Sequence, residues 1–211
     1  MVIRGILLFL NNQQISEGNI NLLSDCRRKR VLAIYDEIYK KQVITSEFLL
    51  RYILKKYYRI NTKEIEILEG KYGKPYIRGR YDYVKFNISH TNNAVLCMVS
   101  DDEIGVDIEK LLPVEYKKIC RVFTSEEEKE VISNNSLEKF YEIFTQKEAF
   151  TKMLGLGLCK PFNTFNVLDN MQNVLKTIKI QDYIISISSK NIAQKKIFID
   201  LVKEDEIRLY E

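Results

Sequence analysis

The stretch Ile104-Gly105-Val106-Asp107-Ile108-Glu109-Lys110 organises the fold expected for this chain, because apolar and polar residues alternate along it. This period of two predicts a half-buried β-strand whose carboxylates, Asp107 and Glu109, leave from the same face. Side chains two positions apart on one face are about 6.5 to 7 Å apart, close enough for one hard cation between them. Gly105 lies on that face, where we expect it to leave space. The alternative is an edge strand that shows both carboxylates to water.

Length and composition restrict the class of protein. The chain has 211 residues, of which 45% are hydrophobic, enough for one large domain or two small ones with a full core. The net charge of +4 suits a phosphate-bearing ligand or an acidic partner but is too small to identify a nucleic-acid binder. The four cysteines are far apart and, with a single histidine, form no zinc-site motif.

The beginning of the chain predicts a strand. The segment 2–10 is largely apolar, but it is too short for a secretion signal and lacks a small-residue cleavage site. No apolar stretch reaches the roughly 20 residues that span a membrane. We therefore expect a cytoplasmic protein with reduced cysteines and no contact with a membrane.

Two helices are expected before residue 60. Ser24-Asp25 can cap a helix that continues through Ile38 and carries four consecutive cations, Arg27 to Arg30, near its start. Positive charge is unfavourable at a helix N-terminus, so a bound anion would relieve the mismatch. The alternative is a solvated basic face. Thr45-Ser46-Glu47 is expected to begin the second helix.

A loop and a hairpin follow. The loop Gly70-Lys71-Tyr72-Gly73-Lys74-Pro75-Tyr76 combines permissive glycines with a rigid proline and offers a lysine from a tight backbone. Residues 84–88 and 94–99 are expected to form a β-hairpin whose turn carries Ser89 and His90. A lone histidine is more often structural than catalytic, but one in a polar turn is well placed for a ligand.

Residues 137–154 are expected to form an amphipathic helix. Its apolar stripe consists of Leu137, Phe140, Tyr141 and Phe144. The helical period places Glu148 in the same stripe, where a buried carboxylate is costly without a partner. Glu148 could therefore be a third ligand for the cation, with Lys147 and Lys152 contacting phosphate. The alternative is an exposed ion pair between Glu148 and Lys152 at i, i+4.

The remaining segments suggest a repeated architecture. Thr124, followed three positions later by Glu127, predicts a capped helix. Four segments are expected to form strands of a second antiparallel sheet: residues 162–168, 174–180, 183–188 and 197–202. We therefore expect an α+β fold of two similar halves, residues 1–104 and 105–211, each with an antiparallel sheet packed against helices.

Five motifs in register over residues 27–158 resemble those of the 4'-phosphopantetheinyl transferases, most closely the surfactin-synthetase-activating type. They are Gly73-Lys74-Pro75, Asn87-Ile88-Ser89-His90, Gly105-Val106-Asp107-Ile108-Glu109, Phe123-Thr124-Ser125-Glu126-Glu127 and Phe144-Thr145-Gln146-Lys147-Glu148-Ala149-Phe150-Thr151-Lys152. The chain departs from the family after the histidine, where Thr91-Asn92-Asn93 replaces a common Ser-Gly pair. The resemblance implies a monomeric pseudo-dimer of two α+β halves, with coenzyme A and Mg²⁺ between them.

The resemblance also implies a reaction and a metal site. The phosphopantetheine arm of coenzyme A would pass to a serine hydroxyl of an apo acyl or peptidyl carrier protein, which is an acidic helical domain. Adenosine 3',5'-bisphosphate would be released. Asp107, Glu109 and Glu148 would bind Mg²⁺, and Glu148 would also be the general base.

By the same resemblance, several side chains would bind the coenzyme. Lys147 and Lys152 would face its phosphates, and Lys152 would stabilise the departing charge. Gly73, Lys74 and Pro75 would line the pocket for adenine and phosphate. Ser89 and His90 would contact phosphate, His90 that of the 3' position. Arg27 and Arg30 would offer positive charge to the same group.

Two other classes of function stay open at this point. A Mg²⁺-dependent nucleotidyltransferase also places paired acids on a strand, but it would carry a Gly-Ser signature at a helix start shortly before them, which this sequence lacks. A basic RNA-binding protein could use residues 27–30 and the thirteen tyrosines. Steep salt dependence of nucleic-acid binding without Mg²⁺ would favour this second class, although it leaves Glu148 unexplained.

Overall fold

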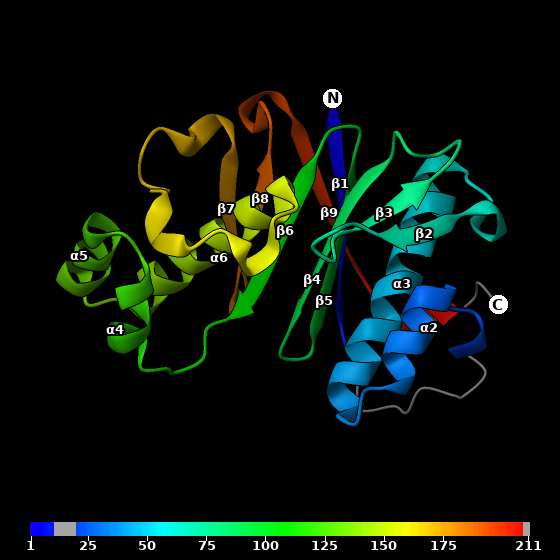
Figure 1. Ribbon diagram of the computed structural model, residues 1–211, viewed down its shortest axis with the longest axis horizontal. Coiled ribbons are helices and arrows are strands. Elements are labelled where there is room, and N and C mark those ends of the chain that lie inside the picture. Colours follow the sequence, from blue (N-terminus) through cyan, green and yellow to red (C-terminus); the bar gives the residue numbers. More distant parts are fainter. Residues whose placement is uncertain (11–19, 209–211) are drawn as a thin grey trace.

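The computed structural model describes residues 1–10 and 20–208, and its elements form two α+β halves side by side (Figure 1). The first half contains β1 (Val2–Phe9), α2 (Asp25–Leu32), α3 (Glu37–Tyr58), β2 (Glu66–Glu69), β3 (Pro75–Arg78), β4 (Lys85–Thr91) and β5 (Ala94–Ser100). The elements that follow are β6 (Ile104–Lys110), α4 (Tyr116–Ile119), α5 (Ser125–Asn134), α6 (Leu137–Leu154), β7 (Leu175–Ile180), β8 (Tyr183–Ser189), β9 (Lys196–Val202) and α7 (Glu204–Arg208). The predicted α+β class with two halves is confirmed.

Two sheets form the centre of the molecule, in the strand orders β4-β5-β1-β9 and β6-β8-β7. Strand β9 was expected in the second sheet, but it pairs in parallel with β1 and so completes the first. Its inward residues Ile197 and Ile199 pack against the apolar cluster between the sheets, which explains this position. The chain thus returns to the first sheet after the second is complete, and the division at residues 104 and 105 stays a prediction.

Three apolar layers hold the sheets and their helices together. One lies between α3 and the first sheet and includes Leu49, Ile53, Val95 and Cys97. A second layer lies between the two sheets, and a third between the second sheet and helices α5 and α6. The sheets and their helices therefore stack as one continuous body.

The N-terminal helices differ from the prediction. Helix α2 ends at Leu32, so Lys29 and Arg30 lie in its last turn, where positive charge is favourable. The dipole mismatch expected from a longer helix is therefore reduced, because only Arg27 and Arg28 remain in the first turn, together with Asp25. A separate helix, α3, begins at Glu37 with Asp36 as its N-cap. The segment 45–47 lies buried in the middle of α3 and does not begin a helix.

The helices of the second half begin as predicted. Thr124 and Glu127 form the capping box of α5, and α6 ends at Leu154, where it is capped by Gly155 with a φ of 68°. Residues 162–168 were expected to form a strand but contain a short 3₁₀ turn. Their backbone bends because the carbonyl groups of Phe162 and Phe165 both accept hydrogen bonds from Lys147. Among the described residues, no helix is long and apolar enough to cross a membrane.

Candidate active site between the two halves

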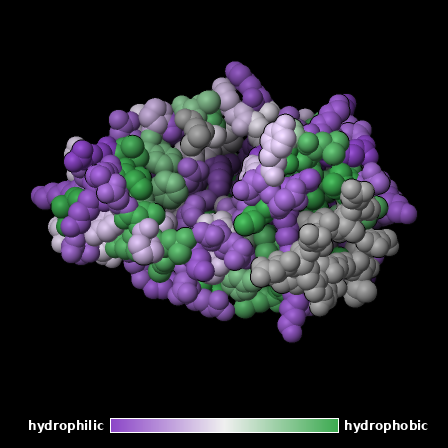
Figure 2. All heavy atoms as spheres, turned by 90° about the horizontal axis from the view of Figure 1, so that it is seen from below, coloured by the Kyte–Doolittle hydropathy of each residue, from purple (hydrophilic) through white to green (hydrophobic). Residues whose placement is uncertain are grey.

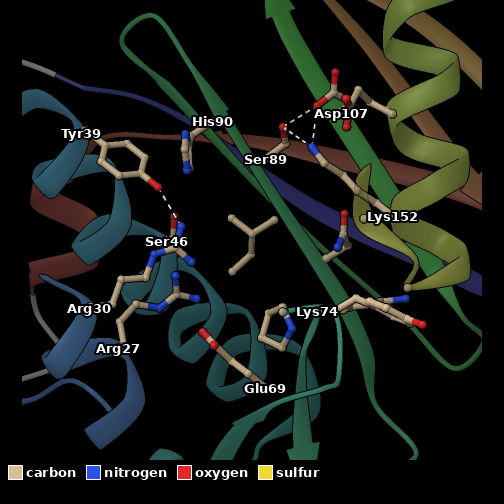
Figure 3. Close-up of a pocket in the computed structure, with 18 of the residues that line it drawn as sticks. Arg27, Arg30, Tyr39, Ser46, Glu69, Lys74, Ser89, His90, Asp107 and Lys152 are labelled. Carbon is tan, nitrogen blue, oxygen red and sulfur yellow. Dashed lines mark hydrogen bonds and ion pairs between the residues drawn. The ribbon is translucent and has the colours of Figure 1, made fainter. Parts of the chain in front are cut away.

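A cleft of about 410 Å³ lies between the halves and is lined by residues of both. Figure 2 shows hydrophilic side chains gathered around a hollow near the middle of one face of the molecule. Eleven of the twelve site residues predicted from the sequence line this cleft; Lys147 does not. Figure 3 shows Arg27, Arg30 and His90 on one side and Asp107 with Lys152 on the other. The cleft therefore has an end where cations predominate, although Glu69 also lies there, and a carboxylate end.

Strands β4 and β6 meet along the floor of the cleft through side chains. The Asn87 Oδ1 atom accepts a hydrogen bond from the Val106 N–H at 2.8 Å. The Ser89 Oγ atom accepts one from the Ile108 N–H at 3.3 Å. Strands β4 and β6 belong to different sheets, so these side-chain hydrogen bonds take the place of a backbone ladder. The seam between the sheets thus opens into the cleft.

The same seam orients the two carboxylates of β6. Ser89 donates a hydrogen bond to Asp107 Oδ1 at 2.8 Å, and Thr91 donates one to Glu109 Oε2 at 2.7 Å. Ser89 and His90 were expected in a turn, but β4 extends to Thr91, so both lie within the strand. The alternation of Asn87, Ser89 and Thr91 is the sequence signal that could have revealed this polar face.

Asp107 is the most deeply buried acid of the cleft, with 3% of its surface exposed. Its Oδ1 atom accepts hydrogen bonds from Ser89 and from Lys152 Nζ, the latter at 2.6 Å. Its Oδ2 atom is buried without a hydrogen-bond partner among the described residues. Leaving a buried carboxylate oxygen unsatisfied is costly, so this atom is the part of the cleft best suited to a cation.

The pKa values of the other two carboxylates, Glu109 and Glu148, are raised by burial and by the charge of Asp107. Burial, and then the charge of Asp107, raise the pKa of Glu109 to about 7. The same two causes raise the pKa of Glu148 above its usual range. Within residues 1–10 and 20–208, no three acidic, histidine or cysteine side chains gather closely enough to enclose a metal ion. The three carboxylates share one cleft without forming a closed ligand set.

Gly105 allows the backbone of helix α6 to pack directly against β6, beside the carboxylates. A Cβ atom at this position would lie 2.0 Å from the Ala149 carbonyl oxygen and 2.2 Å from the Met153 nitrogen. The space that we expected beside Asp107 is therefore filled by the backbone of α6. Only glycine allows this approach, which places Glu148 and Lys152 of α6 in the wall of the cleft.

Lys147 points away from the cleft, contrary to the prediction that it faces phosphate. Its side chain is 0% exposed, and its Nζ atom lies 2.7 Å from Glu127 Oε2. It also donates to the carbonyl groups of Phe162 and Phe165, both at 2.7 Å. One residue along a helix turns the side chain by about 100°, so Lys147 and Glu148 cannot share a face. The partnership with Glu127 was not predicted from the sequence.

The cationic end combines α2, α3 and β4. Arg30 donates a hydrogen bond to the Tyr39 hydroxyl at 2.7 Å, and the Tyr39 ring lies edge-on to His90 at 5.5 Å. Burial, and then the charges of Lys152 and Arg30, lower the pKa of His90 to about 4. Arg27 lines the cleft beside Arg30. This concentration of positive charge around a neutral histidine is suited to an anion.

Lys74 lines the cleft from the loop between β2 and β3, in which Gly73 has a φ of 81°. Its Nζ atom donates to Glu103 Oε2 at 2.8 Å and to the Met153 carbonyl at 3.0 Å. The ammonium group therefore lies at the C-terminal end of α6, where positive charge is favourable. The loop lines the cleft as predicted from the sequence.

Two halves around a cleft with carboxylates at one end and cations at the other are typical of enzymes that transfer phosphate-bearing groups. The sequence model of the 4'-phosphopantetheinyl transferase superfamily matches residues 103–194. The model described as 4'-phosphopantetheinyl transferase, N-terminal, matches residues 14–102. The chain belongs to the 4'-phosphopantetheinyl transferase superfamily and is an enzyme of this class.

Individual relatives agree with this family. The 4'-phosphopantetheinyl transferase Sfp of Bacillus subtilis is 28% identical over 159 residues, which cover 74% of this chain and 70% of the relative. The 4'-phosphopantetheinyl transferase gsp of Aneurinibacillus migulanus is 32% identical over 126 residues, 58% of this chain and 52% of the relative. The chain resembles the Sfp type, and the family replaces the nucleotidyltransferase and RNA-binding alternatives.

Proposed function

We propose that this enzyme transfers the phosphopantetheine arm of coenzyme A to a serine hydroxyl of an apo acyl or peptidyl carrier protein. The serine oxygen forms a bond to the phosphorus next to the arm, and the bond to the bridging pyrophosphate oxygen breaks. Adenosine 3',5'-bisphosphate leaves. The observation that carries this proposal is that Asp107, Glu109 and Glu148 line the same cleft as the cationic end. We further propose that the enzyme works as a cytoplasmic monomer and depends on Mg²⁺.

The residues of the carboxylate end fit Mg²⁺. The ion prefers carboxylate oxygens together with substrate phosphate oxygens, and Asp107 Oδ2 is a buried oxygen without a hydrogen-bond partner among the described residues. Asp107, Glu109 and Glu148 would hold the ion. When bound, Mg²⁺ supplies a Lewis acid that withdraws charge from the phosphate under attack.

Glu148 and Lys152 have complementary roles in this proposal. Glu148 accepts the serine proton. The raised pKa of its carboxyl group supports this role, because a general base works best when its pKa lies near the pH of the reaction. Lys152 already places its ammonium group 2.6 Å from Asp107. From there it can move to the phosphate and neutralise the charge that develops on the departing oxygen.

The cationic end would bind the 3'-phosphate of the coenzyme. Arg27 and Arg30 supply permanent positive charge, and His90 is neutral at pH 7 because its pKa is lowered to about 4. Neutral histidine donates one N–H to a phosphate oxygen, and the bound anion would raise its pKa. Lys74, with Gly73 and Pro75, would hold the adenine and the pyrophosphate.

Intact mass spectrometry tests the proposal. The full chain is incubated with coenzyme A, Mg²⁺ and several apo carrier proteins from fatty-acid, polyketide and peptide assembly. We expect at least one carrier to gain the mass of one phosphopantetheinyl group. Unchanged masses for all carriers, when a known transferase modifies the same samples, would contradict the proposal.

A further inference from the structure

We infer that Glu47, a carboxylate behind the cationic end, is the positioning residue that holds Arg27 and helix α2 toward the bound anion. Glu47 would thereby set the preference for coenzyme A over 3'-dephospho-coenzyme A. This inference rests on the proposed function, because it takes the 3'-phosphate as the anion. Glu47 lies on α3, is 1% exposed and does not line the cleft.

Glu47 joins α3 to the start of α2. Its Oε1 atom accepts a hydrogen bond from the Ser24 N–H at 2.8 Å, and its Oε2 atom accepts one from the Ser24 hydroxyl at 2.8 Å. Arg51 donates to Oε1 through Nη2 at 2.5 Å and Nε at 3.0 Å. Arg27 Nε lies 4.0 Å from Oε2. A buried carboxylate with this many donors is rigidly held.

Ser24 shows that this anchor replaces an ordinary cap. Ser24 is the N-cap of α2, a position where serine usually accepts a hydrogen bond from the first turn. Within the described part of the chain its hydroxyl accepts no capping hydrogen bond from a backbone N–H of the first turn; it is directed at Glu47, to which it donates. Helix α2 has eight residues, too few to be stable alone in water. Its position therefore depends on contacts with its neighbours, α3 and β2.

Arg27 is the link from Glu47 to the cleft. Its side chain is 12% exposed, and it lines the cleft beside Arg30, three residues further along α2. Burial is the main cause that lowers the pKa of Arg27, and the charge of Glu47 is the main opposing cause. Loss of the carboxylate charge would leave Arg27 and Arg51 without their shared counter-ion. The arginines would then move toward other partners or water, away from the geometry seen in Figure 3.

Titration calorimetry with the Glu47→Gln variant tests this role. Coenzyme A and 3'-dephospho-coenzyme A are titrated into the full chain, and the ratio of their affinities is compared with that of the wild type. We expect the ratio to fall about tenfold, the effect of one weakened charge-assisted contact, with little change for the dephospho ligand. A purely structural role would weaken both ligands equally or neither, and either result would overturn the inference.

Two further variants make the result specific. Glu204→Gln is the matched control, because Glu204 is another buried carboxylate, paired with Lys41 at 2.8 Å, and lies outside the cleft lining. It should keep the wild-type ratio. If Glu47→Gln does not fold, Ser24→Ala removes only one of the hydrogen bonds to Glu47 and should lower the ratio about threefold. An unchanged ratio in Ser24→Ala would then overturn the inference.

A double variant tests whether Glu47 acts through Arg27. Adding Glu47→Gln to Arg27→Met should lower the ratio less than Glu47→Gln lowers it in the wild type, because contacts in one network are not additive. Independent, multiplying losses would contradict the link. If the wild type itself binds both ligands equally, the proposed 3'-phosphate site fails. If the wild type prefers coenzyme A and Glu47→Gln keeps this preference, only the inference about Glu47 fails.

Discussion

Two lysine–carboxylate pairs lie on different sides of helix α6 and have different surroundings. Lys147 and Glu127 are both 0% exposed, and the lysine donates to Glu127 and to two carbonyl groups. Lys152 is 28% exposed, and its partner Asp107 retains one buried oxygen without a partner among the described residues. A pair whose hydrogen bonds are complete fixes the fold. A pair left incomplete beside a cleft is available for chemistry.

The largest effect is expected at the incomplete pair. Asp107→Ala should lower the transfer rate by at least about 10³-fold, because it removes a metal ligand worth several kcal/mol to the transition state. The fold should persist, since Lys152 can extend into water. An assay of transfer to an apo carrier measures the rate, and circular dichroism measures whether the fold persists. Full activity in this variant would refute the role of Asp107.

Breaking the complete pair, Lys147 with Glu127, should lower the stability of the fold. Lys147→Met leaves Glu127 buried without its counter-ion and should lower the free energy of unfolding by about 3 to 5 kcal/mol in a urea titration. Adding Glu127→Gln removes the unpaired charge and keeps one acceptor oxygen for the N–H groups of Thr124 and Val167, so it should recover part of this loss. Lys152→Met is the comparison and should cost less than Lys147→Met, because the Lys152 side chain is 28% exposed and its pair lies beside the open cleft. Equal losses for Lys147→Met and Lys152→Met would remove the distinction between the pairs.

A substitution of Glu148 should lower the turnover rate more than the affinity for coenzyme A. Glu148→Gln keeps the shape of the side chain but cannot accept a proton, so the turnover rate should fall about 10²- to 10³-fold. The affinity for coenzyme A, measured by calorimetry, should change little by comparison. An unchanged turnover rate would remove Glu148 as the general base.

The smallest effect is expected at the cationic end. His90→Ala should weaken coenzyme A about tenfold, the worth of one hydrogen bond to a charged group. The affinity for 3'-dephospho-coenzyme A should stay near that of the wild type. Equal losses for the two ligands would contradict the assignment of His90 to the 3'-phosphate.

Local patterns predicted the elements that carry the site. Alternation identified β6, the capping box identified the start of α5, and helical periodicity with Gly155 identified α6. These features depend on neighbours in the sequence, so the sequence contains the necessary information. The family resemblance then identified twelve site residues, of which eleven line the cleft.

Features that depend on distant contacts were not predicted. The parallel pairing of β9 with β1 joins the two ends of the chain, and the turn in residues 162–168 depends on the buried Lys147. Lys147 follows the family pattern beside Glu148, yet the partner that turns it inward, Glu127, lies on a different helix. The role of Gly105 also required knowing which backbone lies above it.

Calorimetric titration of Mg²⁺ in the presence of coenzyme A tests the central claim most directly, because the claim is that the carboxylates of β6 and α6 serve one ion. The wild type should bind one ion per chain, and Asp107→Ala and Glu148→Gln should each weaken this binding by about tenfold or more. Glu204→Gln should bind like the wild type. Equal Mg²⁺ binding by the wild type, Asp107→Ala and Glu148→Gln would contradict the account.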